Sequence, residues 1–269
     1  MSASQWIIRG GKALPTSASG AASMTELGHC VYTSLRTLKG LPVALGTHWN
    51  RLQAGEGQGM GRPRQESVTE VLRQAIELGA PDDVVVTLGW NGKELLTHVK
   101  NLPPKPKPPI FVRLATASRE YGEIKDSTWI TEREKLDWSQ KPHEIIMQNE
   151  AGLLSEGASS NVFVVQNGAL KTADKGVLNG TIRSLVLKVA NERGVPVELE
   201  SPDWNSRASW EDAFITSTSR LVLPVDKIAD DAGNVIAFKE HTMIVRQLEQ
   251  GVEAALESES GFFLHADQE

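Results

Sequence analysis

The first residues of this sequence that could do chemistry are one carboxylate and one helix start. Glu156 lies in a turn rich in glycine and serine, residues 155–161, and an apolar run follows it directly. Further along, Gly180 and Thr181 stand where an amphipathic helix is expected to begin. Backbone N–H groups at a helix N-terminus, together with the helix dipole, suit a phosphate. Taken alone, a hydroxyl at this position is more often a simple helix cap.

Other patterns for catalysis or metal binding are missing from the sequence. The 6 histidines are scattered without the spacing of metal ligands, so no metal site is expected. The sequence contains no G-x-S-x-G elbow, no P-loop and no G-x-G-x-x-G fingerprint. Serine hydrolysis and nucleotide binding through these motifs are therefore not indicated.

Composition limits the class of protein and its partners. The chain has 269 residues and a formal net charge of -6, which does not favour a nucleic-acid or membrane partner. Cys30 is the single cysteine, so an intramolecular disulfide is excluded and a reducing compartment is indicated. No signal-peptide core and no apolar run of membrane-spanning length is present. We expect a cytoplasmic protein.

Strands and helices are expected in an α+β order. Apolar runs and alternation predict strands over residues 6–9, 30–36, 41–45, 84–88, 95–99, 110–115, 144–147, 162–165 and 197–199. Residues 221–227 and 235–238 frame a turn at 231–233. Helical periodicity predicts helices over residues 48–52, 67–79, 125–136, 185–194 and 243–256. A capping-box pattern marks the start at Ser67, Asn167-Gly168 marks a hairpin, and residues 13–24 are expected to be a loop.

A proline-rich segment is the clearest boundary in the chain. Five prolines lie within residues 101–109, and so many prolines continue neither a helix nor a sheet. We therefore expect a small N-terminal domain over residues 1–100, a linker over 101–109, and a C-terminal domain over 110–269.

Several motifs, taken in order, resemble one enzyme family. These are the H-x-x-R-L at residues 48–52, SEGASSNVF at 155–163, VLNGTIR at 177–183 and FITSTSRLVLPV at 214–225. They resemble the fold-type IV, or class IV, pyridoxal-phosphate enzymes, which include the branched-chain and D-amino-acid aminotransferases and aminodeoxychorismate lyase. The third motif departs from the family's L-x-G-I-T-R because its Ile-Thr pair is swapped.

The resemblance implies both a fold and an activity. The implied fold is the two-domain fold of D-amino-acid aminotransferase, with a small N-terminal α/β domain and a larger C-terminal α/β domain that binds pyridoxal 5′-phosphate. The implied activity moves an amino group between an amino acid or amine and a 2-keto acid. The implied assembly is a homodimer, because the family's active site borrows a loop from the neighbouring subunit.

The resemblance also implies a role for each matching residue. Lys125 would form the Schiff base with the cofactor, since Lys135 and Lys141 are at worse spacing. Glu156 would pair with the pyridinium nitrogen, and Arg51 would bind the phosphate. The other implied cofactor-binding residues are Asn161, Leu178, Gly180, Thr181, Ile182 and Thr218.

The substrate side is less determined. Tyr32, Thr33 and Trp129 are the implied substrate residues, and His48 is expected to be structural. Thr33 resembles the lyase, whereas the motifs at 155–163 and 216–219 resemble D-amino-acid aminotransferase, so a lyase that releases pyruvate stays an alternative. A non-catalytic family member is a second alternative. The ligand of the substrate carboxylate is open among Arg36, Arg113 and Arg220.

Overall fold

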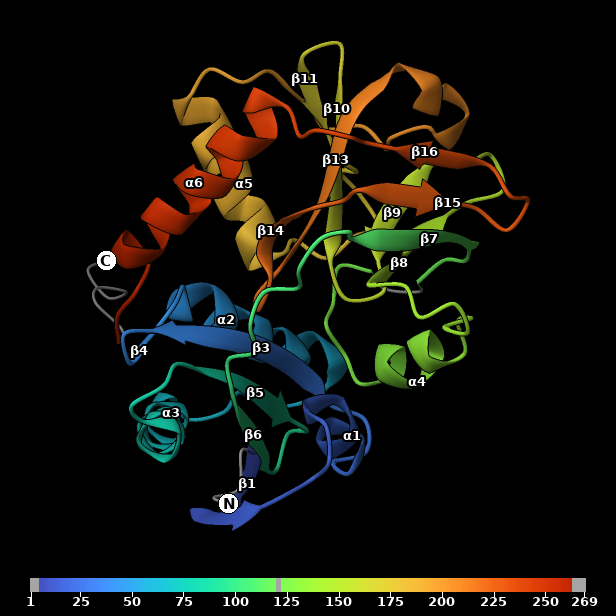
Figure 1. Ribbon diagram of the computed structural model, residues 1–269. Coiled ribbons are helices and arrows are strands. Elements are labelled where there is room, and N and C mark those ends of the chain that lie inside the picture. The colour runs from blue at the N-terminus through green and yellow to red at the C-terminus, as the bar shows by residue number, and fades with distance from the viewer. Residues whose placement is uncertain (1–4, 120–121, 263–269) are drawn as a thin grey trace. The chain divides into compact units, whose positions relative to one another are not determined.

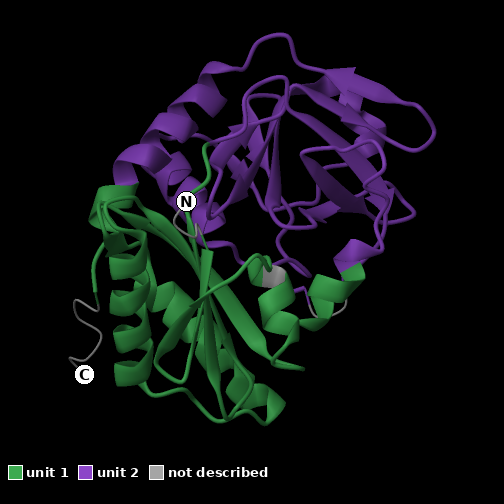
Figure 2. Cartoon of the chain, turned by 60° about the horizontal axis from the view of Figure 1, so that its bottom comes forward, with its two compact units in different colours: residues 1–104, 124–132, 256–269 green, residues 105–123, 133–255 purple. Residues whose placement is uncertain are grey.

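The computed structural model describes residues 5–119 and 122–262, and the chain divides into two compact units (Figure 2). Unit 1 comprises residues 1–104, 124–132 and 256–269, and unit 2 comprises residues 105–123 and 133–255. The domain division at residues 101–109 stays a prediction. Neither unit is one continuous stretch of chain, because residues 124–132 and 256–269 belong to the same unit as the N-terminal part.

Unit 1 is built on an antiparallel sheet with the strand order β2-β1-β6-β5-β3-β4. Its strands are β1 (Gln5–Arg9), β2 (Lys12–Pro15), β3 (Val31–Leu38), β4 (Leu41–Pro42), β5 (Val84–Trp90) and β6 (Leu95–Asn101). The helical elements of this unit are α1 (Gly20–Thr25), α2 (Leu45–Gln53), η1 (Ala54–Gln58), α3 (Gln65–Gly79) and α4 (Thr128–Glu134), of which α4 continues into unit 2.

Helical periodicity explains how α3 packs. Val68, Leu72 and Ala75 lie on one face of the helix, are buried, and form a core with residues of β5 and β6. The helix begins at Gln65, with Arg64 as N-cap, so the start predicted at Ser67 is wrong. An acidic residue in the first turn complements the helix dipole, which permits the earlier start.

The segment 13–24 is not the loop that its small polar residues suggest. It contains part of β2 and most of α1. The strand forms because it pairs with β1, and the helix forms because Ser19 caps it by accepting a hydrogen bond from the N–H of Ala22. Composition alone reveals neither the pairing with β1 nor the cap by Ser19.

Unit 2 contains a mixed sheet with the order β12-β11-β10-β9-β8-β7-β15-β16, and β13 joins β10 to β14. Its strands are β7 (Phe111–Thr116), β8 (Glu144–Gln148), β9 (Leu154–Gly157), β10 (Asn161–Gln166), β11 (Ala169–Lys171), β12 (Val197–Glu198), β13 (Trp210–Ser217), β14 (Leu221–Pro224), β15 (Lys227–Ala229) and β16 (Val235–Ala237). Its helical elements are α5 (Thr181–Glu192), η2 (Trp204–Ser209) and most of α6 (Met243–Ser258).

The two faces of β13 pack against different partners. Ala213 and Ile215 belong to an apolar core with Val162 and Val164 of β10. Phe214 faces the other way and stacks on Phe163, with ring centroids 4.8 Å apart. On the same side of unit 2, α5 and α6 lie side by side (Figure 1), and Gly251 permits their close approach because an added Cβ would overlap Val189.

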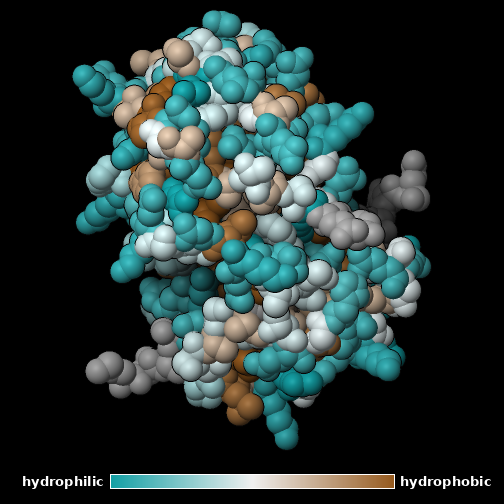
Figure 3. All heavy atoms as spheres, turned by 90° about the vertical axis from the view of Figure 1, so that its right-hand side faces the viewer, coloured by the Kyte–Doolittle hydropathy of each residue, from teal (hydrophilic) through white to brown (hydrophobic). Residues whose placement is uncertain are grey.

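The described surface is mixed in polarity. On the face drawn in Figure 3, hydrophilic side chains surround the hydrophobic ones. The large apolar side chains that are exposed come from separate segments of the chain: Leu14, Leu41, Trp138, Leu153, Leu199, Val235 and Met243. Across residues 5–119 and 122–262, no helix has the length and apolarity that crossing a membrane requires.

Candidate active site

The backbone around Lys125 is paired with the start of β3. The carbonyl of Lys125 accepts a hydrogen bond of 2.8 Å from the N–H of Tyr32, and Asp126 bridges Val31 in antiparallel fashion. Ser127 donates its N–H to the carbonyl of Cys30, at 2.8 Å. This pairing is extended rather than helical, so α4 begins only at Thr128 and the helix predicted from residue 125 is too long.

Two predicted substrate residues, Tyr32 and Thr33, leave opposite faces of β3, because side chains alternate along a strand. The Nζ of Lys125 lies 5.1 Å from the centroid of the Tyr32 ring. Thr33 is fully buried, and its Oγ1 is 2.6 Å from Nδ1 of His48 on α2. The structure thus brings Tyr32 to Lys125 and Thr33 to His48.

His48 is buried near two cationic side chains, Arg51 and Lys125. Burial lowers the pKa of His48 well below its ordinary value, and the charges of Arg51 and Lys125 lower this pKa further. Burial also lowers the pKa of Arg51 to about 10. Arg51 lies one helical turn after His48 on α2. Burial of its charge costs free energy, and a bound anion would offset that cost.

Trp129, the third predicted substrate residue, is buried on α4.

In unit 2, three polar side chains form a row across neighbouring strands. Asn161 of β10 is directly opposite Glu156 of β9 on one side and Thr216 of β13 on the other. Residues directly opposite one another in antiparallel strands share a face of the sheet. All three are buried, and within the described residues Oγ1 of Thr216 has no hydrogen-bond partner.

Glu156 and Asn161 together hold the loop that precedes α5. Oε2 of Glu156 accepts the N–H of Leu178 at 3.0 Å, and Nδ2 of Asn161 donates to the carbonyl of Leu178 at 2.7 Å. Gly180 packs directly on Asn161, where an added Cβ would overlap Oδ1. The other oxygen of Glu156 is 3.3 Å from Nη1 of Arg119, whose side chain is also buried. Arg119 is not among the residues predicted for the site, because nothing local to it in the sequence signals this pairing.

The N-terminus of α5 is arranged as an anion site. Gly180 is its N-cap, and it provides no side-chain cap. The first N–H groups of a helix have no partners within the helix and carry partial positive charge. Thr181 and Ile182 open the helix and are buried. Thr218 lies in the turn that connects β13 to β14 and is half-buried.

The three arginines considered for the substrate carboxylate have other partners. Arg113 forms ion pairs with Asp137 and Asp231, which raise its pKa. Arg220 pairs with Glu144 at 2.6 Å. Arg36 is buried and directs Nε to the carbonyl of Thr37 at 3.5 Å.

The residues present fit pyridoxal 5′-phosphate. In unit 2 the α5 terminus suits a phosphate and the buried carboxylate of Glu156 suits a protonated ring nitrogen. In unit 1 the guanidinium of Arg51, whose pKa is depressed by burial, is also of a kind that binds phosphate. The orphaned hydroxyl of Thr216 adds a polar atom on the same sheet face as that carboxylate. These donors serve a phosphorylated aromatic cofactor better than a metal, and no cluster of metal ligands occurs in the described part of the chain.

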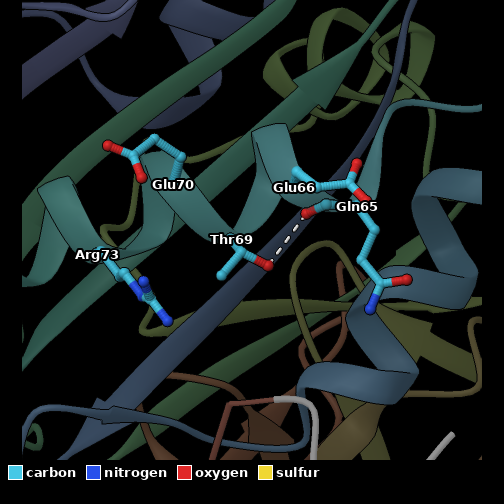
Figure 4. A pocket seen from close by; sticks show the side chains of 5 residues that line it. All are labelled: Gln65, Glu66, Thr69, Glu70 and Arg73. Atoms are coloured by element: carbon cyan, nitrogen blue, oxygen red, sulfur yellow. Dashed lines mark hydrogen bonds between the residues drawn. The ribbon is translucent and has the colours of Figure 1, made fainter.

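A surface pocket on α3 is unrelated to these residues. It is lined by five side chains of that one helix, as Figure 4 shows: Gln65, Glu66, Thr69, Glu70 and Arg73. The hydroxyl of Thr69 donates back to the carbonyl of Gln65 at 3.0 Å. Since the pocket contains none of the candidate residues, it is a groove of the helix surface.

Solved structures share this fold. An aminotransferase from Brucella abortus bound to the cofactor PLP aligns with a TM-score of 0.78 at 19% identity, over 94% of this chain and 99% of that chain. The branched-chain aminotransferase from Thermoproteus uzoniensis with norvaline aligns with a TM-score of 0.74 at 18% identity, over 94% of this chain and 95% of that chain. The fold is therefore that of the fold-type IV aminotransferases, which confirms the predicted fold class.

Sequence similarity gives the family. The D-alanine aminotransferase of Staphylococcus epidermidis is 25% identical over 258 residues, which cover 87% of this chain and 90% of that protein. Residues 30–228 match the family described as amino-transferase class IV, and the chain belongs to that family. This confirms the predicted transaminase activity and the predicted cofactor, pyridoxal 5′-phosphate. The lyase is not favoured, since the named relatives are aminotransferases.

Proposed function

We propose that this protein transfers an amino group between an amino acid, or a simple amine, and a 2-keto acid, and that Lys125 holds the cofactor covalently through Nζ. The observation that supports this proposal is the position of Lys125, whose backbone is hydrogen-bonded to β3. Its Nζ lies 5.1 Å from the centroid of the Tyr32 ring, and its charge lowers the pKa of His48. Membership of the class IV aminotransferases supplies the reaction class.

We assign the remaining cofactor contacts residue by residue. Glu156 binds the ring nitrogen, and Asn161 orients Leu178, which packs on the ring. Arg51 binds the phosphate as a bidentate cation. The other phosphate ligands are Gly180, Thr181, Ile182 and Thr218, through backbone N–H groups and the threonine hydroxyls.

Lys125 also moves the proton in this proposal. When bound, pyridoxal 5′-phosphate supplies an electron-withdrawing ring that stabilises negative charge at the substrate Cα. The amine of Lys125 would take the proton from the substrate Cα and return it. Glu156 keeps the ring nitrogen protonated, and Tyr32, Thr33 and Trp129 line the substrate side. The carboxylate of Glu156 accepts hydrogen bonds from Arg119 and from the N–H of Leu178, which hold it in place.

The assembly and its location form part of the same proposal. We infer a homodimer from the family resemblance and a cytoplasmic, reducing compartment from the free and buried Cys30. Nucleic acid and membrane are not expected partners, because the net charge is -6.

Substitution of Lys125 tests the proposed function. The purified protein is reduced with borohydride in the presence of pyridoxal 5′-phosphate, and the modified peptide is sequenced by mass spectrometry. We expect the adduct on Lys125, and we expect Lys125→Ala to lower kcat by about 10²- to 10⁴-fold because the proton-transfer group is lost.

Lys135→Ala and Lys141→Ala are the matched controls, and both are expected to keep the adduct and the activity. An adduct on another lysine in the wild-type protein would show the assignment to be wrong. A screen of D-amino acids, L-amino acids and amines, read as the spectral change of the cofactor, then identifies the donor.

A further inference from the structure

Glu144 is a fully buried carboxylate that lies away from the predicted site residues in sequence. It is the first residue of β8, and its side chain is 1% exposed. A buried charge is tolerated only when it is paired and hydrogen-bonded. Oε2 of Glu144 is 2.6 Å from Nη2 of Arg220 and accepts a hydrogen bond of 2.6 Å from Oγ of Ser159. Oε1 accepts the N–H of Ile145 at 3.1 Å.

The guanidinium of Arg220 is satisfied within unit 2. Besides Glu144, Nη2 donates to Oγ of Ser159 at 3.0 Å, and Nη1 donates to the carbonyl of His143 at 3.1 Å. Nε donates to Oγ of Ser217 at 2.9 Å. A guanidinium has five N–H donors in a fixed plane, and these partners already surround it. Arg220 is therefore not available to bind a substrate carboxylate.

These contacts join two loops that carry proposed cofactor residues. Ser159 belongs to the loop between Glu156 of β9 and Asn161 of β10. Arg220 ends the turn that contains Thr218. The first loop is also closely packed on Glu144, because a Cβ at Gly157 would come within 3.0 Å of Cγ of Glu144. Glu144 thus lies where the two loops meet.

The residue directly after this turn has a costly backbone conformation. Leu221, directly after Arg220, has a φ of 55°, in the left-handed region that non-glycine residues seldom adopt. Such a conformation persists only where surrounding contacts enforce it. The preceding residue, Arg220, is held by four acceptors.

We propose that Arg220 is a positioning residue which, through Glu144 and Ser159, holds the turn of Thr218 against the loop 157–160 and so fixes Thr218 for the phosphate of the cofactor. This inference rests on the proposed function, since it concerns the same site. It removes Arg220 from the candidate ligands of the substrate carboxylate and gives the buried carboxylate of Glu144 a function.

Cofactor affinity tests the proposal. The cofactor is removed from the full-length wild-type protein and from Ser159→Ala, Arg220→Lys and Arg113→Lys variants, and each is titrated with pyridoxal 5′-phosphate to give a Kd. Thermal unfolding of the cofactor-free proteins and KM for the keto acid at saturating cofactor are measured in parallel. Arg113 is the matched control, because it is another arginine of unit 2 that forms ion pairs with carboxylates.

We expect Arg220→Lys to raise the Kd about tenfold and Ser159→Ala to raise it about threefold, since each loses one or more hydrogen bonds of the network. KM is expected to change less than about twofold, because the cofactor is saturating. Arg113→Lys is expected to lower the melting temperature without changing the Kd. Ser159→Ala keeps the buried ion pair, so it answers the question even if Arg220→Lys does not fold.

The failures can be told apart. If Arg220→Lys and Ser159→Ala bind the cofactor as tightly as the wild type, and only their melting temperatures fall, the network is merely structural and the inference is overturned. A tenfold rise in KM with an unchanged Kd would make Arg220 a substrate ligand and also overturn it. Wild-type protein that takes up no cofactor would overturn the proposed function itself.

Discussion

At the scale of single residues, burial and two neighbouring cations determine the charge state of His48. Nδ1 of His48 is 2.6 Å from Oγ1 of Thr33, and His48 is 1% exposed. Burial, Arg51 and Lys125 lower the pKa of His48 from its ordinary 6.5. The folded protein therefore keeps His48 neutral at pH values where the unfolded chain binds a proton.

This difference gives a pH dependence with a definite sign. Below pH 6.5 the unfolded state binds one more proton than the folded state, so the free energy of unfolding decreases as the pH falls. The contribution from one group is at most about 1.4 kcal/mol per pH unit. The free energy of unfolding is measured in urea between pH 7.5 and 5 for the cofactor-free wild type and the cofactor-free His48→Asn variant. We expect it to fall more steeply with decreasing pH in the wild type than in the variant.

His29→Asn is the control for that experiment, since His29 is exposed. It is expected to follow the wild-type pH dependence. Equal slopes for the wild type and His48→Asn would mean that His48 is protonated in the folded state, contrary to its burial.

At the scale of elements, the N-terminus of α5 depends on a glycine. Gly180 has a φ of −62°, which any residue can adopt, so space rather than backbone conformation requires glycine here. An added Cβ would overlap Oδ1 of Asn161, whose amide holds the carbonyl of Leu178. A side chain at position 180 would therefore move the loop that Glu156 and Asn161 support.

We predict that Gly180→Ala lowers the free energy of unfolding by about 1–3 kcal/mol, which is the usual cost of overpacking. It should also raise the Kd for pyridoxal 5′-phosphate, because the helix start would move. Denaturant unfolding and cofactor titration measure the two effects. Gly61→Ala is the control, since a Cβ there meets no atom within 4 Å; a similar loss in both variants would contradict the steric argument.

Local pattern predicted the elements whose causes are local. The Asn167-Gly168 pair does connect β10 to β11, and both residues have positive φ, at 53° and 72°. The spacing of apolar residues predicted which face of α3 is buried, because that spacing follows from the geometry of the helix itself. The residues 13–24 and the start of α4 were predicted wrongly. In residues 13–24, pairing with β1 and a cap by Ser19 override the loop-like composition. At α4, pairing of residues 125–127 with the distant start of β3 delays the helix.

The same limit holds for the site. Glu156, Asn161 and the α5 start could be named from sequence, because each lies in a short motif. Their partners could not, since Arg119 and Arg220 meet Glu156 and Glu144 only through folding. Arg220 even had a different predicted role among the candidates for the substrate carboxylate, because a sequence does not reveal which buried carboxylate an arginine neutralises.

At the scale of the whole molecule, we predict a homodimer. The mass from light scattering is expected to be about twice the chain mass of 29.3 kDa, in the presence and absence of added cofactor. A monomeric mass for a protein that retains cofactor and activity would contradict the family resemblance on which this prediction depends. Serial dilution during the measurement separates a stable dimer from a weak one.

The pairing of residues 125–127 with β3 has a consequence for solubility. Before Thr37, β3 pairs with β5 on one side, and its other side meets Lys125 and Asp126. An uncovered strand edge is a template for aggregation with other chains. The segment that carries Lys125 thus also shields the start of this edge, so we expect substitutions that release it to make the protein precipitate.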